Sequence, residues 1–336
     1  MRDVCGIHAQ VQAAAELSIC ARVNGVTQED VRAALWRDRT LVKAWTLRGT
    51  LHLHPTDELP LWFAARRAVT GDTDAALDEW RDPAGVLHPA LDAAEVAEIR
   101  RAVLAALDGR TLLREEIVEE VLPHVGRRAE GRLRSGFAFF LAETCQGPPQ
   151  GNKITLARPD QWLGQWHEVD ETEALQEVCR RFLRTYGPST PQAFREWFGA
   201  QDFLTDEIEE IEIEGKSAFV VEGDKRFPEP TSTLRLLPEY DAYVMGFRER
   251  DRLVPDAVRR QVAAHGRGKY EGPAGVRFLM IDGVAAGLWE RKKRAKRIEL
   301  HVTPSRKLTR AERAELDTEA GRIGVFLGLE PVLTVG

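Results

Sequence analysis

Three stretches of the chain share one pattern, in which amphipathic helices joined by a short turn are followed by strand-like residues. The third copy is the clearest. Apolar residues in its first helix follow i, i+3, i+4, i+7, i+8 spacing, at Leu175, Val178, Cys179, Phe182 and Leu183. After the turn YGPST, Thr190 is a predicted N-cap and Pro191 the first helical residue. So short a turn predicts a helix-turn-helix, and the alternative is a plain helical hairpin.

The first copy lies near the N-terminus. A helix is predicted from about Val4 to Val23, and Asn24-Gly25 ends it. Thr27 and Asp30 have capping-box spacing, so a second helix is expected to begin there. The alternating run LVKAWTLRGTLHLH then predicts strands up to Pro55, before a helix through DELPLWFAARRAV. Two helices followed by a strand pair is the order of a winged helix.

The second copy has the same order. Its first helix is marked by Val96, Ile99, Val103 and Leu107, and Asp108-Gly109 is expected to end it. Further helices are predicted around Ile117 to Leu122 and Leu133 to Leu141. The stretch QGPPQGNKITLARPDQWLG is typical of a wing-like hairpin.

The last third of the chain changes character. STLRLLPEYDAYVMGF, VRFLMIDGVAAGLWE and KRIELHVTP are strand-like, and Asp282-Gly283 is a two-residue hairpin signal. A final helix is expected from Thr309, with Glu312 completing a capping box. We therefore predict an α+β fold, with tandem winged-helix units and a C-terminal antiparallel β-meander closed by one helix. The expected units are residues 1–90, 91–168, 169–228 and 229–336.

The composition of the 336 residues is ordinary for a soluble globular protein, with 43% hydrophobic and 30% charged residues. No apolar run approaches the ~20 residues that a membrane helix needs, and the N-terminus lacks the layout of a signal peptide. The cysteines are scattered without a CxxC pair, which argues against a zinc site and a disulfide framework. We expect a cytoplasmic protein with no membrane partner.

The formal net charge of -6 weighs mildly against nucleic-acid binding, because a DNA-binding surface must neutralise phosphates. The charge is uneven, however: Asp206 to Glu214 is strongly acidic, and Arg291 to Arg297 is almost wholly basic. A local basic stripe is therefore compatible with the acidic total. No GxGxxG, P-loop, HExxH or GxSxG arrangement occurs, which leaves nucleotide-cofactor, kinase and serine-hydrolase functions without support.

His8, Gln10 and Gln12 lie close together in an otherwise apolar stretch, CGIHAQVQAAAELSICARV. Residues two apart do not share a face in mid-helix, but near a bent helix start they can point into one cleft. Histidine can polarise or deprotonate a water, and a glutamine amide can hold a water or a sugar oxygen. The alternative is a satisfied buried histidine beside two solvent-facing glutamines, and the residues alone favour that alternative.

The alternating run presents a second polar constellation, which consists of Thr46, Arg48, Thr50, His52 and His54. Arg48 is suited to bidentate contact with a phosphate, and the two histidines to hydrogen bonds with a substrate. The alternative is the solvated face of an antiparallel sheet. Zinc binding by these histidines with His8 is not expected, because no carboxylate stands at a telling spacing.

Two basic clusters are candidates for DNA contacts. One follows the strand that ends at Trp289 and consists of Arg291, Lys292, Lys293 and Arg294. On an antiparallel hairpin it could lie along a DNA backbone, and the alternative is a solvated turn. The other flanks the second predicted recognition helix and consists of Arg127, Arg128, Arg132 and Arg134. Neither cluster specifies a base sequence.

CGIHAQVQAAAELSICARV and LVKAWTLRGTLHLHPTDELP closely resemble the winged-helix family that includes the AlkZ and YcaQ DNA glycosylases. FLRTYGPSTPQAFREWFG, LLPEYDAYVMGFRERDRLVP and IDGVAAGLWERKKRAKRIEL also match, so the resemblance covers nearly the whole chain. It implies tandem winged helices that form a C-shaped, DNA-sized channel. It also implies excision of bulky N7-alkylated purines and, for some members, unhooking of interstrand crosslinks.

The family's catalytic motif is glutamine, an apolar residue and glutamine, with aspartate last in the YcaQ branch. It falls here on His8-Ala9-Gln10, a departure at the first position that resembles a divergent branch, and Gln12 lies outside it. By this resemblance Gln10 would position a water for attack at C1′ of the deoxyribose, and His8 would orient that water or accept its proton. Relatives carry another helix before the motif, so we expect a truncated start or an incomplete first unit.

The sequence thus predicts a monomeric DNA-repair glycosylase that acts on double-stranded DNA without a metal or organic cofactor. The residues expected to contact DNA are Arg48, Thr50, His52, Arg132, Arg134 and the cluster from Arg291 to Arg294. The alternatives are a non-catalytic winged-helix DNA-binding protein or regulator, and a resistance protein that sequesters a small molecule.

Overall fold

A computed structural model describes residues 1–71, 75–82, 84–164, 166–199, 207–226, 229, 231–247, 250–266 and 272–336. The chain divides into two compact units. Unit 1 comprises Met1–Ala33, Leu183–Ser189 and Glu209–Gly336, and unit 2 comprises Ala34–Phe182 and Thr190–Ile208. The N-terminal segment therefore packs with the C-terminal third of the chain. The four units expected from the sequence stay a prediction.

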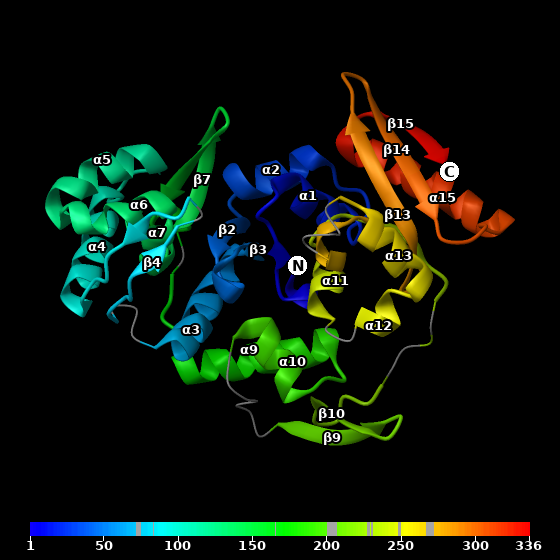
Figure 1. Cartoon of the computed structure of the whole chain (residues 1–336), viewed down its shortest axis with the longest axis horizontal. Helices are drawn as coiled ribbons and strands as arrows, with labels where there is room; N and C mark the ends of the chain where they lie inside the picture. The colour runs from blue at the N-terminus through cyan, green and yellow to red at the C-terminus, as the bar shows by residue number, and fades with distance from the viewer. Residues whose placement is uncertain are drawn as a thin grey trace. The chain divides into compact units, whose positions relative to one another are not determined.

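Unit 2 combines short antiparallel strands with helices (Figure 1). Its paired strands follow the order β3 (Leu51–Pro55), β2 (Leu41–Trp45), β7 (Cys145–Gln150), β8 (Lys153–Ala157) and β6 (Leu112–Leu113). A separate small hairpin is formed by β4 (Trp80–Arg81) and β5 (Leu87–His88). The helices are α3 (Leu59–Thr70), α4 (Ala93–Ala106), α5 (Arg114–Val125), α6 (Glu130–Ser135), α7 (Phe137–Leu141), α8 (Pro159–Trp162), α10 (Pro191–Phe198) and most of α9 (Glu171–Tyr186).

The second predicted group of helices is confirmed as α4 to α7. Asp92 accepts a hydrogen bond from the Glu95 amide at 2.9 Å, and the Glu95 carboxylate accepts one from the Asp92 amide, which forms a capping box for α4. The helices pack their apolar stripes into one core that includes Val96, Ile99, Val103, Ile117, Val121, Leu133 and Phe139. The predicted wing-like hairpin is also present, as the antiparallel pair β7 and β8.

The third predicted pair of helices is confirmed as α9 and α10. The Thr190 hydroxyl accepts a hydrogen bond from the Ala193 amide at 3.2 Å, and Pro191 is the first residue of α10. The ring centroid of Phe182 lies 5.3 Å from that of Phe194 and 5.0 Å from that of Trp197. The periodic apolar residues of the two helices thus form their mutual interface.

Unit 1 contains a five-stranded sheet in the order β11 (Leu234–Leu237), β12 (Phe278–Ile281), β13 (Val284–Lys293), β14 (Arg297–Pro304) and β15 (Glu330–Val335). Asp282 and Gly283 have positive φ values of 49° and 77°, and they form the expected turn between β12 and β13. The capping box of Thr309 and Glu312 also begins α15 (Arg310–Leu327) as predicted. Besides α1 (Gln12–Cys20) and most of α2 (Gln28–Trp36), unit 1 contains β9 (Ile208–Ile213), β10 (Lys216–Val221), α11 (Ala242–Gly246), α12 (Arg250–Leu253) and α13 (Asp256–Ala264).

The prediction of a wholly antiparallel C-terminal meander is wrong at its last strand. Neighbours from β11 to β14 are antiparallel, but β15 pairs with β14 in parallel, from Arg297 opposite Glu330 to Val302 opposite Val335. A parallel pair needs a crossover connection, and α15 supplies it by returning the chain to the start of β14. The sheet is therefore mixed, and α15 packs against β11, β14 and β15.

The N-terminal segment is the second correction. A single helix from Val4 to Val23 was expected, but β1 (Ile7–His8) precedes a shorter α1 (Gln12–Cys20), and α2 (Gln28–Trp36) follows. Cys5 and Gly6 have positive φ values of 54° and 89°, which a right-handed helix cannot contain. The chain is therefore extended at His8.

The alternating run around Arg48 is the third correction. Its strand-like residues do not share one continuous face, because β2 ends at Trp45 and β3 begins at Leu51. The turn between them is tight, with Arg48 and Gly49 at φ values of 51° and 67°. The expected strand pair is thus confirmed, but its polar residues are divided between a turn and a buried strand.

None of the helices described is long and apolar enough to cross a membrane. All four cysteines are buried. The expected acidic run is described from Glu207 onward and contains β9, whereas Asp206 lies outside the described residues.

Candidate functional site

The segment His8-Ala9-Gln10 connects β1 to the start of α1. Ile7 and Ala9 are buried, His8 is half-buried and Gln10 is exposed. Alternating burial is typical of an extended chain, in which residues two apart point to the same side. The helix that was expected to include His8 and Gln10 is absent at this point, and the chain bends at Gln10 before α1 begins.

The last turn of α9 holds the start of this segment within unit 1. The Tyr186 hydroxyl donates a hydrogen bond to the Val4 carbonyl at 3.0 Å, and the Thr185 hydroxyl donates one to the Asp3 carbonyl at 3.1 Å. The Cys5 sulfur lies 3.4 Å from the Thr185 hydroxyl oxygen. These contacts fix the chain on the N-terminal side of His8.

Gln12, the third polar residue of this stretch, belongs to an internal network. Its amide donates to the Glu16 carboxylate at 3.4 Å, one turn further along α1. Glu16 is fully buried and also accepts hydrogen bonds from Gln28 at 2.6 Å and from Arg32 at 3.0 Å. A buried carboxylate needs such partners, so Gln12 contributes to the stability of unit 1.

On the other side of His8 stands Tyr240, whose ring centroid lies 5.2 Å from that of the imidazole at an interplanar angle of 43°. The two neighbours of Tyr240 are buried carboxylates. Glu239 accepts hydrogen bonds from Arg277 at 2.6 and 2.9 Å, and Asp241 accepts them from Arg22 at 2.6 and 2.8 Å. The sequence argument assigned no role to these residues, although LLPEYDAYVMGF was among the matching stretches. Only packing reveals that the Tyr240 ring lies beside the His8 ring.

The pKa directions in this network agree with its geometry. Burial alone would raise the pKa of Glu239, but the Arg277 guanidinium holds it below its usual value. Burial would likewise lower the pKa of Arg22, and the Asp241 carboxylate raises it instead. The charged forms of Glu239 and Arg22 are therefore favoured, and each carboxylate is tied to its arginine.

Arg48 and Thr50, two of the expected DNA contacts, lie at the turn between β2 and β3. Arg48 is exposed, and its guanidinium donates a hydrogen bond to the Trp197 carbonyl near the C-terminus of α10, where a cation is favoured. The Thr50 hydroxyl donates to the Leu47 carbonyl at 2.9 Å. The structure thus brings these two residues together at the turn between β2 and β3.

His52 and His54 are buried in β3 and do not form a solvated strand face. His52 Nδ1 lies 3.0 Å from the Thr50 carbonyl oxygen, which can only accept, so Nδ1 carries a proton. His54 is fully buried, lies 2.9 Å from the Thr46 hydroxyl and packs on Trp62 with ring centroids 4.7 Å apart. Burial, with a smaller effect of Arg181, lowers the pKa of His54 to about 3. His54 is therefore a neutral core residue.

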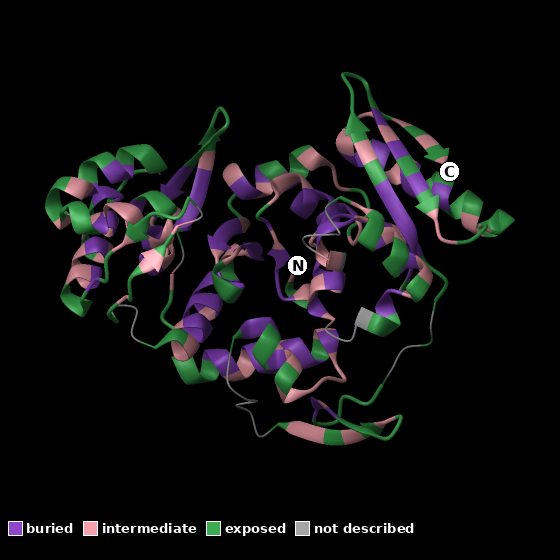
Figure 2. Cartoon of the chain, in the orientation of Figure 1, coloured by how far each residue is buried: buried purple, intermediate pink, exposed green. Residues whose placement is uncertain are grey.

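The basic cluster from Arg291 to Arg294 lies at the end of the β13–β14 hairpin. Figure 2 shows that this hairpin is buried at its base and exposed toward its tip. Lys292, Lys293 and Arg294 are exposed, whereas Arg291 is half-buried and burial lowers its pKa. Arg294 forms an ion pair with Glu299 at 3.2 Å. Lys292 and Lys293 therefore carry the most accessible charges of this cluster.

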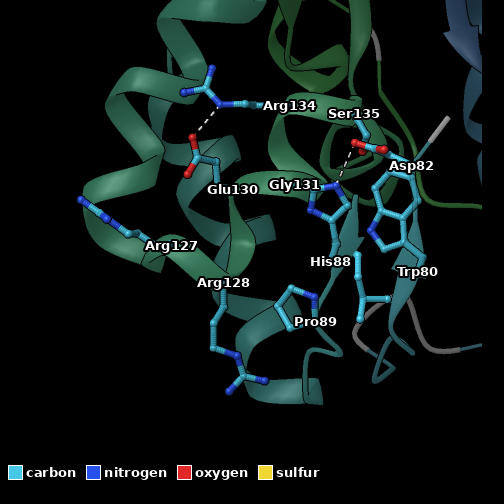
Figure 3. Close-up of a pocket in the computed structure, with 11 residues that line it drawn as sticks. Trp80, Asp82, His88, Pro89, Arg127, Arg128, Glu130, Gly131, Arg134 and Ser135 are labelled. Carbon is cyan, nitrogen blue, oxygen red and sulfur yellow. Dashed lines mark hydrogen bonds and ion pairs between the residues drawn. The ribbon is translucent and has the colours of Figure 1, made fainter. Parts of the chain in front are cut away.

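The second basic cluster borders a cavity of about 840 Å³ in unit 2 (Figure 3). Arg127, Arg128 and Arg134 lie on its helical side, and the β4–β5 hairpin contributes Trp80 and His88. The two rings stack with centroids 4.8 Å apart, and His88 pairs with Asp82 at 3.2 Å. A Cβ atom on Gly131 would stand 1.9 Å from His88 Nδ1, so this close approach of α6 requires glycine.

Arg132 differs from the other arginines of this cluster. Its guanidinium carbon lies 5.1 Å from the Trp80 ring centroid and 5.4 Å from that of Phe137. It also donates a hydrogen bond to the Asp78 carbonyl, and burial lowers its pKa. Arg132 thus packs on aromatic rings within unit 2, while Arg134 is exposed and paired with Glu130 at 2.7 Å. Among the described residues, no group of three or more His, Cys, Asp and Glu side chains is placed to hold a metal ion.

Comparisons with known proteins agree over almost the full length. A protein-family model described as DNA glycosylase AlkZ-like matches residues 1–326. The chain is 30% identical to an interstrand DNA cross-link repair glycosylase of Streptomyces sahachiroi, over 97% of this chain and 89% of that protein. It also matches the structure of the Streptomyces sahachiroi DNA glycosylase AlkZ with a TM-score of 0.77 and 27% identity, over 99% of this chain and 92% of that one.

Proposed function

The chain belongs to the AlkZ-like DNA glycosylase family, and we propose that it hydrolyses the N-glycosidic bond of bulky or N7-alkylated purines in double-stranded DNA. The observation that carries this proposal is the non-helical His8-Ala9-Gln10 segment, which places a half-buried imidazole and an exposed amide two positions apart directly before α1. The substrates include purines in interstrand crosslinks, because the Streptomyces relative is named for crosslink repair.

The chemistry of such a substrate limits what the protein must supply. Alkylation at N7 makes the purine cationic, so the base leaves without strong general-acid help. The sugar then develops oxocarbenium character, and one water must reach C1′. An uncharged amide and an imidazole suit this task, because they hold and polarise a water without adding a second strong charge.

Within this reaction Gln10 positions the water, and His8 orients it or accepts its proton. A catalytic group must lie within hydrogen-bond reach of the proton that it takes, and His8 and Gln10 stand two positions apart in a segment that is not helical. Histidine at this position replaces an amide in the family motif. A neutral imidazole can both donate and accept a hydrogen bond.

Two groups of residues, one in each unit, provide the contacts to DNA. In unit 2 the turn at Arg48 and Thr50 and the exposed Arg134 contact phosphates, with His52 and Arg132 supporting them from within. In unit 1 the cluster from Arg291 to Arg294 lies along the backbone of the duplex. Such contacts set the register of the protein on DNA and do not read a base sequence.

The order of elements supports tandem winged helices as the finer description of the fold. Helices followed by an antiparallel hairpin occur three times along the chain, ending in β2–β3, β7–β8 and β9–β10. We assign the units to residues 1–90, 91–168 and 169–228, with a C-terminal β-rich domain at 229–336. The protein acts as a monomer.

Incubation with duplex DNA that contains N7-methylguanine, followed by an assay for abasic sites, tests the proposal. We expect wild type to release the base above the spontaneous rate. Gln10→Ala and His8→Ala should each lower the single-turnover rate by about 100-fold or more, in the range of general acid–base catalysis. Gln12→Ala is the matched control, because its amide belongs to the Glu16 network, and it should keep the rate.

Wild type that releases no more base than a variant with both alanine substitutions would refute the enzyme proposal. Retained DNA binding with a steep loss of affinity in added salt would then indicate a non-catalytic DNA-binding protein. Loss of both activities would point to sequestration of a small molecule.

A further inference from the structure

The backbone of Tyr240 is held in an unusual conformation. Its φ of 58° lies in the left-handed region, which is disfavoured for residues with a bulky side chain. Such a conformation persists only where the surrounding structure over-determines it, and it is concentrated at functional sites. The contacts that hold the Tyr240 backbone, and the contacts of its side chain, therefore bear on the function of this site.

Two buried ion pairs hold this residue from both sides. Glu239 is bound through two hydrogen bonds to Arg277, and Asp241 through two to Arg22. The Ser18 hydroxyl adds a third bond to Asp241 at 2.6 Å. The Tyr240 amide itself donates to the Ala274 carbonyl at 2.8 Å. The peptide groups on either side of Tyr240 thus have little freedom to relax.

The two ion pairs and the bond to Ala274 form a clamp on Tyr240, and the side chain that they hold is not part of the core. Tyr240 is half-buried between two buried carboxylates, and its ring faces the His8 imidazole with centroids 5.2 Å apart. Glu239 and Asp241 are only 2% and 0% exposed. Two buried ion pairs therefore flank a ring that is only half-buried. This arrangement indicates that the position of the ring matters more than its contribution to the packing of the core.

We propose that Tyr240 is a positioning residue, whose clamped ring fixes the orientation of the His8 imidazole relative to Gln10. This inference rests on the function proposed above. A catalytic side chain must be held within about 0.5 Å of its productive place, and a rigid aromatic neighbour limits rotation of the imidazole about its side-chain bonds. Without the ring, His8 samples other rotamers, and the water at Gln10 loses its second contact.

Three substitutions of Tyr240 distinguish the effect of the aromatic ring from the effect of the backbone conformation. Tyr240→Phe keeps the ring and should keep the single-turnover rate of base release within about threefold of wild type. Tyr240→Leu removes the aromatic face and should lower that rate by about tenfold or more. Tyr240→Gly tolerates a positive φ, so it should lower the rate equally while the thermal midpoint stays near that of wild type. The Kd for duplex DNA that contains an abasic-site analogue should be unchanged in all three.

A second readout does not depend on activity. The carbon-bound protons of the His8 ring should show a ring-current shift in NMR spectra, which Tyr240→Phe preserves and Tyr240→Gly abolishes. Glycine or leucine variants that release base within twofold of wild type would overturn the proposal, as would rate losses that simply follow a weaker Kd. Wild type that releases no base refutes the proposed function, whereas a missing ring-current shift refutes the contact between Tyr240 and His8 alone.

Discussion

Two short strands of this protein carry histidines, and the structure places them in opposite environments. In β3, His54 is fully buried against Trp62 and the Thr46 hydroxyl. In β1, His8 is half-buried, and its ring lies beside Tyr240 in a loop held by ion pairs. On sequence grounds His8 was a candidate for catalysis and His54 for a hydrogen bond with a substrate. Burial within a packed core marks a structural histidine, whereas partial exposure beside a clamped aromatic ring marks a candidate for chemistry.

The largest expected effect that tests this contrast between His54 and His8 is the pH dependence of stability. His54 has a pKa of about 3 in the folded protein because of burial, against 6.5 in its unperturbed state. Between pH 3 and pH 6.5 the unfolded chain binds more protons than the folded protein. The stabilising contribution of neutral His54 is therefore complete above pH 6.5 and is lost as pH falls toward 3. At about 1.4 kcal/mol per pKa unit, the loss is on the order of several kcal/mol.

Urea unfolding of wild type and His54→Gln from pH 7 to pH 4 measures this effect. The amide of glutamine can still hydrogen-bond Thr46 but does not titrate, so the difference between the two proteins should shrink as pH falls. Equal pH dependence in both proteins would show that His54 is not a buried neutral residue.

Truncation of each histidine at neutral pH is the next test. His54→Ala leaves a cavity and removes the hydrogen-bond partner of a buried hydroxyl, so it should lower the free energy of unfolding by about 3 kcal/mol. His8→Ala should lower it by less than about 1 kcal/mol, because the side chain is half-exposed. Denaturant titrations measure both values, and a larger loss for His8 than for His54 would reverse the two assignments.

The smallest effect concerns the exposed tip of the β13–β14 hairpin. Lys292→Ser with Lys293→Ser should leave stability unchanged and lower the slope of log Kd against log salt by about one for each lysine that contacts a phosphate. Fluorescence anisotropy with a labelled duplex measures that slope. The matched control is the exposed Lys307, which follows β14 at the end of the hairpin opposite the tip, and its replacement by serine should not change the slope. An unchanged slope in the hairpin variant would remove this tip from the DNA contacts.

Local signals in the sequence predicted several elements correctly. The cap at Thr190, the capping box of Thr309 and Glu312 and the turn at Asp282-Gly283 all occur as expected, because each depends on residues within a few positions of one another. The parallel strand β15 and the strand at His8 were missed. The first depends on a crossover through α15, and the second on left-handed residues that no apolar period reveals.

By itself the sequence determined the family, the order of helices and hairpins, and the short motif His8-Ala9-Gln10, since all of these are written in neighbouring residues. The packing of distant segments determined which polar side chains are available to contact a substrate. It enclosed His54, bound Gln12 to Glu16 and brought Tyr240 to His8 across 232 positions of the chain. Burial and partner choice arise from contacts between distant segments, and no local pattern encodes them.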